Sequence, residues 1–172
     1  MRKAIVVFFS KEGENFVNGK KQILTIGNTE IVAKKISEAL DSPIAKLQPI
    51  ISYPTGYEET LERSKKERQE NSMICYQNLG IDWKAVETVF LGFPNWWGSC
   101  PQIVKTFLKE SDWSKKTIYP FCTHEGSGFG SSIQELKKQY PNAKIKCGLP
   151  IRGSRVDRSD TAIKNWLFGI YK

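Results

Sequence analysis

Histidine is nearly absent from this chain of 172 residues, which carries His124 as its single imidazole. A lone histidine has neither the companion ligands of a metal site nor the partners of a catalytic triad. We therefore expect His124 to be a hydrogen-bonding loop residue. No serine or cysteine lies in a pattern typical of an activated nucleophile, so the sequence predicts no catalytic residue of that kind and no metal site.

Cysteine is also scarce, with four residues and no CxxC pair: Cys75, Cys100, Cys122 and Cys147. Their wide spacing favours reduced thiols over disulfides or a zinc site, which predicts a cytoplasmic protein. We interpret Cys100 as a packing residue.

Long apolar runs are missing as well. None reaches the roughly 18 residues that a membrane-spanning helix needs, so we expect no membrane span. The apolar run 4–9 after a basic start is too short for a signal peptide and has no cleavage site, which favours a buried first strand. Because repeats, linkers and low-complexity tracts are also absent, we expect a single domain over residues 1–172.

Acidic residues are outnumbered: 18 Asp and Glu face 26 Lys and Arg, for a formal net charge of +8. Residues 111–172 hold 11 basic and 5 acidic side chains, and therefore +6 of that charge. The excess indicates either a solvated basic surface or attraction to an acidic partner. Nucleic acid is not expected as a partner, because no dense basic run with interleaved aromatic residues occurs.

Apolar runs and helical periodicities alternate along the chain. Strands are predicted at residues 4–9, 43–47, 86–93, 117–122 and 143–149, and helices at residues 28–40, 60–70, 101–108, 131–139 and 157–171. This alternation predicts an α/β fold, a doubly wound five-stranded parallel sheet between two helix layers. In such a sheet ligands bind beyond the carboxyl ends of the strands, where three loops of this chain would meet.

The first of these loops joins the strand at 4–9 to the next helix. It begins at Ser10 and ends with Gly27, Asn28 and Thr29, of which Asn28 or Thr29 is the expected N-cap. The glycine allows close backbone approach, and the free N–H groups of the helix's first turn suit a phosphate. An ordinary capped helix is the alternative interpretation.

The second loop reads Pro94-Asn95-Trp96-Trp97-Gly98. Two adjacent indoles at the exit of a buried strand offer a flat apolar wall that suits a planar aromatic ligand. The alternative is a pair of tryptophans that only closes the edge of the domain.

The third loop runs through residues 123–130. It contains Thr123, His124, Glu125, Gly126, Ser127, Gly128 and Phe129. Its glycines would let the backbone lie close to a ring, although a plain flexible loop is an alternative.

Together, and in this order, the three loops resemble those of a flavodoxin over nearly the whole chain. The resemblance implies strand order 2-1-3-4-5 and a non-covalent FMN cofactor. It places the phosphate at Ser10, Gly27, Asn28 and Thr29, and the isoalloxazine between the tryptophan loop and residues 126–130. The permissive backbone of Gly98 further suggests that a peptide of its loop reorients to accept a hydrogen bond from the reduced flavin.

One segment departs from the family pattern, since residues 12–26 are longer than the usual short phosphate loop. Asn18-Gly19 between apolar-rich arms predicts an inserted β-hairpin there. A similar insertion in the phosphate-loop region occurs in a flavodoxin-like subfamily.

The resemblance implies an electron carrier between two redox partner proteins, a reductase and an acceptor. The alternative is an FMN-dependent NAD(P)H oxidoreductase that acts on quinones or similar small acceptors. A third possibility is a flavin-free binding or signalling module on the same fold. The sequence does not choose among oligomeric states.

Overall fold

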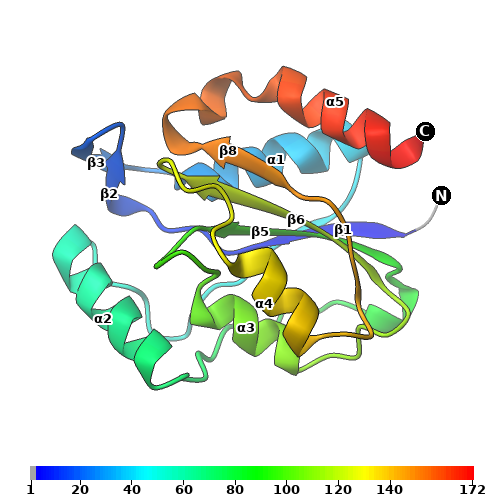
Figure 1. The fold of residues 1–172 in the computed structure, drawn as a ribbon, viewed down its shortest axis with the longest axis horizontal. Helices are drawn as coiled ribbons and strands as arrows, with labels where there is room; N and C mark the ends of the chain where they lie inside the picture. Colours follow the sequence, from blue (N-terminus) through cyan, green and yellow to red (C-terminus); the bar gives the residue numbers. More distant parts are fainter. Residues whose placement is uncertain (1–2) are drawn as a thin grey trace.

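The computed structural model describes residues 3–172 and contains a parallel β-sheet flanked by helices (Figure 1). The strands of the sheet are β4 (Ile44–Lys46), β1 (Ala4–Phe8), β5 (Thr88–Pro94), β6 (Thr117–His124), β7 (Lys144–Ile145) and β8 (Leu149–Arg152). They pair in the order β4-β1-β5-β6, with β7 and β8 both paired to β6, and every pair is parallel. When the strands of this sheet are numbered along the chain, with β7 and β8 together as the fifth, their order is 2-1-3-4-5, as the resemblance implies.

The predicted fifth strand at 143–149 is wrong in its extent. Two short strands replace it, β7 and β8, with residues 146–148 between them. Gly148 lies so close to the ring of Phe129 and the carbonyl of Pro120 that a Cβ there would approach them to 2.5 and 2.6 Å. Pro150 lacks an N–H, so β8 suits only the edge of the sheet.

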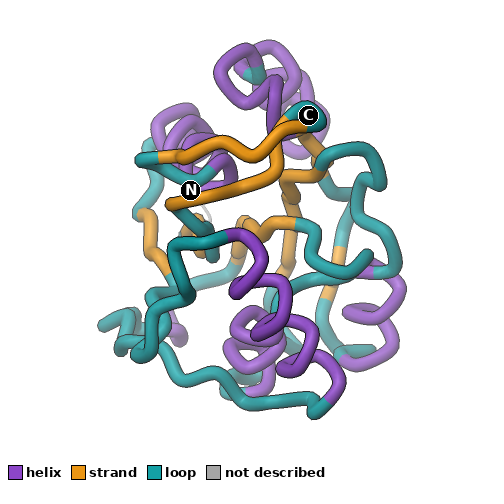
Figure 2. Tube along the Cα trace, turned by 90° about the vertical axis from the view of Figure 1, so that its left-hand side faces the viewer, coloured by secondary structure: helices purple, strands orange, loops and turns teal. Residues whose placement is uncertain are grey.

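Residues 3–172 contain five α-helices: α1 (Asn28–Leu40), α2 (Tyr57–Gln69), α3 (Gln102–Lys109), α4 (Ser132–Gln139) and α5 (Asp160–Tyr171). Short 3₁₀ helices lie at Trp83–Ala85 and Gly153–Arg158. Figures 1 and 2 show α1 and α5 on one side of the sheet and α3 and α4 on the other. The second helix begins three residues earlier than predicted, and the last begins at residue 160 because residues 153–158 are 3₁₀.

Alternating side chains of the central strands feed two separate cores. On β1, Val6 and Phe8 pack with α1 and α5, whereas Ile5 and Val7 point to the core that contains α3. This two-sided burial explains why the strands read as continuous apolar runs instead of alternating ones.

A separate β-hairpin follows β1, as the turn signal at Asn18-Gly19 predicts. Its strands β2 (Gly13–Val17) and β3 (Lys20–Leu24) are antiparallel, and Asn18 and Gly19 have φ of 52° and 79°. Positive φ at both central residues marks a type I′ turn, which favours this dipeptide. Figure 1 shows the hairpin at the end of the sheet where β5 and β6 terminate, next to α2.

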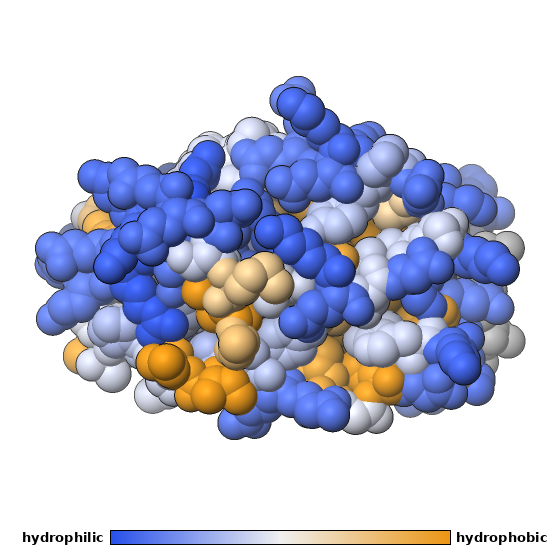
Figure 3. All heavy atoms as spheres, turned by 90° about the horizontal axis from the view of Figure 1, so that it is seen from below, coloured by the Kyte–Doolittle hydropathy of each residue, from blue (hydrophilic) through white to orange (hydrophobic). Residues whose placement is uncertain are grey.

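The surface on the side of α2, α3 and α4 is mostly hydrophilic, and apolar residues form small separate patches on it (Figure 3). Within residues 3–172, no helix combines the length and the hydropathy that crossing a bilayer would require.

Two glycines provide a matched test of the packing. A Cβ at Gly92, in central strand β5, would lie 2.2 Å from the buried ring of Phe121, whereas at Gly169 on α5 nothing lies within 4 Å. We expect Gly92→Ala to lower the free energy of unfolding by about 1–3 kcal/mol through overpacking. Gly169→Ala should raise it by up to about 0.5–1 kcal/mol through helix propensity. Urea unfolding measures both, and equal effects would contradict the described packing.

Candidate functional site

A cavity of about 420 Å³ opens at the carboxyl ends of β1, β5 and β6, where the three predicted loops meet. This volume is within the usual range of small-molecule sites. Ten of the predicted residues line it: Ser10, Asn28, Thr29, Pro94, Asn95, Trp96, Trp97, Thr123, His124 and Glu125.

Gly27 does not line the cavity, but it packs directly against Ser10 and Lys11, which do. A Cβ at this buried glycine would lie 2.2 Å from the Ser10 hydroxyl and 2.6 Å from the Lys11 carbonyl. Gly153 is comparable, since a Cβ there would lie 2.2 Å from a Glu125 carboxylate oxygen and 2.6 Å from the Asn28 amide nitrogen. Both positions therefore let the backbone come close to polar groups of the site.

The other predicted residues outside the cavity lining are Gly98, Gly126, Ser127, Gly128 and Phe129. Asn95 ties part of the third loop down by donating from Nδ2 to the Gly128 carbonyl (2.6 Å) and to the Ser127 hydroxyl (3.2 Å). Phe129 packs edge-on against Phe93, 6.2 Å away, at the core. The start of this loop, and not its glycine-rich part, therefore forms the cavity wall.

One end of the cavity lies at the start of α1, where the sequence predicts a phosphate site. Gly27 is its N-cap, so the prediction of Asn28 or Thr29 as cap is wrong; both are helical. The Ser10 hydroxyl accepts the Glu30 N–H (3.1 Å), while the Thr29 hydroxyl bonds the Thr123 hydroxyl (2.7 Å). First-turn N–H groups and the positive end of the helix dipole thus lie beside two hydroxyls, an arrangement suited to an anion.

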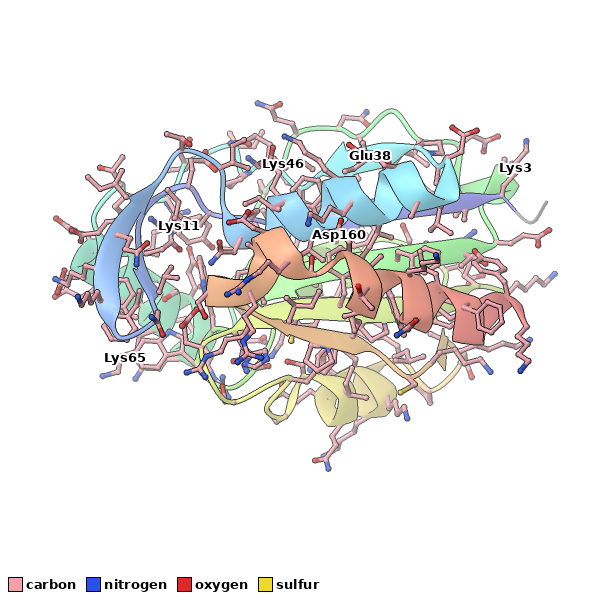
Figure 4. The ribbon with its side chains drawn as sticks, turned by 90° about the horizontal axis from the view of Figure 1, so that it is seen from above. Lys3, Lys11, Glu38, Lys46, Lys65 and Asp160 are labelled. Atoms are coloured by element: carbon pink, nitrogen blue, oxygen red, sulfur yellow. The ribbon has the colours of Figure 1, made fainter. Side chains whose placement is uncertain are left out.

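Lys11 is a buried cation of the cavity wall that sequence reasoning missed. Its ammonium donates to the carbonyls of Glu12, Glu14 and Thr55 at 3.0–3.3 Å (Figure 4). Burial lowers the pKa of Lys11, against the raising effect of nearby Glu12 and Glu14. The side chain joins the base of the hairpin to the loop before α2.

The two tryptophans have different environments. Trp96 packs edge-on against Phe9 and Tyr53, with ring centroids 5.3 and 5.1 Å away, so its indole is mainly structural. Trp97 is 43% exposed and offers its indole to the cavity.

Trp97 also has an unusual backbone. Trp96 and Ser99 exchange two backbone hydrogen bonds (2.9 and 3.0 Å), and the residues between them, Trp97 and Gly98, have φ of 57° and 72°. These values describe a type I′ turn with a tryptophan at its first central position. A left-handed conformation costs a bulky residue about 1–2 kcal/mol, so other contacts must hold it.

Those contacts come from α2 and from the start of α4. The Trp97 indole donates from Nε1 to the Ser64 hydroxyl (3.0 Å), and the Arg68 guanidinium donates to the Trp97 carbonyl. The Gly98 carbonyl accepts from the Ser131 N–H (2.7 Å) and hydroxyl (3.0 Å).

His124 lies on the wall formed by the end of β6. Its buried Nδ1 has no hydrogen-bond partner among residues 3–172, which suits a polar group of a ligand. Burial lowers the pKa of His124 and the charge of Arg152 adds to this, while Glu125 opposes them. The imidazole is therefore neutral at neutral pH.

Several lining residues come from segments that carried no site signal in the sequence: Lys11, Glu14, Asn15 and Phe16 near or on the hairpin, Tyr57, Thr60, Leu61 and Ser64 on α2, and Gly153. The rings of Phe16 and Tyr57 stack 5.9 Å apart and join hairpin to helix. A hairpin was predicted, but nothing in its sequence indicates which face turns to the cavity. The sequence of α2 is so rich in charged residues that it predicts an exposed helix without a role in the site.

Cys100, behind the tryptophan loop, is fully buried, and burial raises the pKa of its thiol to about 12. A protonated thiol is a poor nucleophile, which agrees with a packing role.

Glu135 of α4 collects donors from three segments around the tryptophan loop. Lys105 and Ser99 donate to one carboxylate oxygen (2.8 and 2.6 Å), and Ser131 donates to the other. Partial burial would raise the pKa of Glu135, but these hydrogen bonds and the charge of Lys105 outweigh it and lower the pKa to about 2. The ionised form therefore stabilises the folded state.

This network predicts a defined acid dependence. The stabilisation from Glu135 is present above its ordinary pKa and is lost as the pH falls from about 4.5 toward about 2. We expect Glu135→Gln to be less stable than the wild type at pH 7 and to converge with it near pH 2, as measured by urea midpoints. The control is Glu38→Gln, on the exposed face of α1. Parallel wild-type and Glu135→Gln profiles would rule out this role.

Comparisons with solved structures support the described fold. A candidate flavoprotein from Bacteroides eggerthii is 26% identical, with 99% of this chain and 98% of that chain covered and a TM-score of 0.79. A second, from Bacteroides uniformis, is 26% identical over 96% and 97% of the two chains, with a TM-score of 0.76.

A flavoprotein from Lactobacillus acidophilus, solved in complex with FMN, is 16% identical over 92% and 98% of the two chains, with a TM-score of 0.68. At that identity the likeness shows the fold alone.

A comparison with curated proteins gives no significant match. The family model described as flavodoxin matches residues 22–170, most of the chain. The match begins within the hairpin, so the assignment of residues 12–26 to a subfamily insertion stays a prediction. The doubly wound sheet and the match over residues 22–170 together show that the chain belongs to the flavodoxin family.

Proposed function

We propose that this chain binds FMN in the cavity at the ends of β1, β5 and β6 and serves as an electron carrier. One observation carries the proposal: a single cavity joins an anion-binding helix start to an exposed indole wall. A phosphate group and a planar aromatic ring are the two ends of FMN. Membership of the flavodoxin family and the FMN bound by the Lactobacillus acidophilus flavoprotein support the same cofactor.

The residues present fit this cofactor at both ends. The phosphate would lie at Ser10, Asn28 and Thr29, where Gly27 keeps the backbone close. The ring would lie against Trp97, and the unpartnered Nδ1 of His124 is available to a polar group of the ring.

FMN itself supplies the reversible uptake and release of electrons, and the protein supplies binding, orientation and electrostatic tuning. The indole of Trp97 covers apolar ring surface, and the hairpin and α2 exclude water from the side of the cavity that Phe16 and Tyr57 line. The dipole of α1 and the free N–H groups of its first turn stabilise the phosphate charge.

The partners of such a carrier are a reductase and an acceptor protein in the cytoplasm. The net charge of +8 favours partners with acidic docking surfaces, because complementary charge speeds their encounter. Such association should weaken as salt concentration rises.

The first experiment is the visible spectrum of the purified protein, with and without added FMN. Flavin absorption bands that remain with the protein on gel filtration are expected. A protein that stays colourless after FMN addition would contradict the proposal and favour the flavin-free module. Steady-state NAD(P)H oxidation by the purified protein alone would instead identify the oxidoreductase alternative.

The two tryptophans give a more specific prediction. Trp97→Ala should weaken FMN binding by about tenfold or more, because it removes ring contact and apolar cover, with little effect on unfolding. Trp96→Ala should mainly lower the free energy of unfolding, by about 3–5 kcal/mol, since its indole packs against Phe9 and Tyr53. FMN titrations and urea unfolding measure the two effects. The reverse pattern would show that Trp96, not Trp97, forms the wall.

A further inference from the structure

The conformation of the Trp97–Gly98 turn depends on two side chains of α2. Ser64 and Arg68 lie four residues apart, and therefore on the same face of the helix. Ser64 holds the indole nitrogen of Trp97, and Arg68 holds its carbonyl oxygen. One helix thus grips both the side chain and the main chain of a residue whose φ of 57° is strained.

The geometry of the turn limits the conformations that the peptide between Trp97 and Gly98 can adopt. Rotation of the central peptide of a type I′ turn gives type II′, a turn that places glycine at its first central position. Trp97 occupies that position, so the peptide cannot rotate there without severe strain, whatever freedom Gly98 has. The other route moves Trp97 to negative φ, which would take its carbonyl from Arg68 and its indole from Ser64.

The neighbouring carbonyl is fixed as well. The Gly98 carbonyl accepts hydrogen bonds from the N–H and the hydroxyl of Ser131, and a Cβ at Gly130 would lie 2.2 Å from that oxygen. Both carbonyls of the turn are therefore committed to protein donors.

From these contacts we infer that Ser64 and Arg68 are positioning residues that lock the Trp97–Gly98 turn in one conformation. The Trp97 carbonyl is bound to Arg68 and is not offered to the cofactor, and the same indole surface faces the cavity in both redox states. This differs from the reorientation that Gly98 alone suggests. The inference rests on the proposed FMN site, but the lock exists without cofactor.

The test uses NMR on the full chain, first without FMN. A strong intraresidue Hα–HN NOE marks positive φ, and we expect it for Trp97 in the wild type. It should weaken in Arg68→Met and in Ser64→Ala, because the distance between these two protons is longer at negative φ. The matched control is Lys65→Met, which removes one charge from the exposed side of the same helix (Figure 4). If Arg68→Met does not fold, Arg68→Lys keeps the charge but loses the planar fork.

The second readout is FMN binding. Release of the turn should raise the FMN dissociation constant about fivefold in Arg68→Met and leave Lys65→Met unchanged. In the wild type the NOE should persist after FMN is bound and after it is reduced.

An unchanged Trp97 NOE in both Arg68→Met and Ser64→Ala would overturn the inference, and so would a weakening of this NOE on reduction of the wild-type protein. A wild type that fails to bind FMN would contradict the proposed function, while the comparison without cofactor would still decide whether α2 locks the turn.

Discussion

The buried hydrogen bond between the hydroxyls of Thr29 and Thr123 joins the first turn of α1 to the end of β6. Ser10, at the end of β1, reaches the same turn through the Glu30 N–H. These two bonds place the positive end of α1 between two parallel strands, where its free N–H groups are directed at the edge of the sheet used by doubly wound folds.

At the other end of the cavity, the constraint is backbone strain balanced by hydrogen bonds. Trp97 occupies a conformation that is costly for any bulky residue, and the bonds from Ser64, Arg68 and Ser131 offset that cost. Glu135 holds Ser131 and Lys105 in turn, so α2, α3 and α4 all contribute to the position of one indole. The tryptophan wall is thus a product of the helices beside the loop as much as of the loop itself.

The parts of this structure that the sequence predicts are those set by short-range patterns. Continuous apolar runs locate the strands, and Asn18-Gly19 locates the hairpin turn, because period and turn chemistry are local properties. The three-loop cavity follows from parallel topology. The fifth strand divides at residues 146–148, where Gly148 lies against Phe129 and Pro120, and this contact joins segments far apart in sequence. The roles of Ser64, Arg68 and Lys11 depend on similar long-range placement, and no local pattern marks them.

The hairpin and α2 contribute residues to the cavity that the three loops predicted from the sequence do not include. Lys11 carries a buried charge whose three carbonyl partners span the hairpin and the loop before α2, so the two segments are fixed relative to each other. Phe16 and Tyr57 stack across the same junction, and Glu14 accepts the N–H of Tyr57 (2.9 Å). The hairpin and α2 are therefore fixed to each other on one side of the cavity. Farther along the helix, α2 holds Trp97 through Ser64 and Arg68, so the helix contacts both the hairpin and the tryptophan loop.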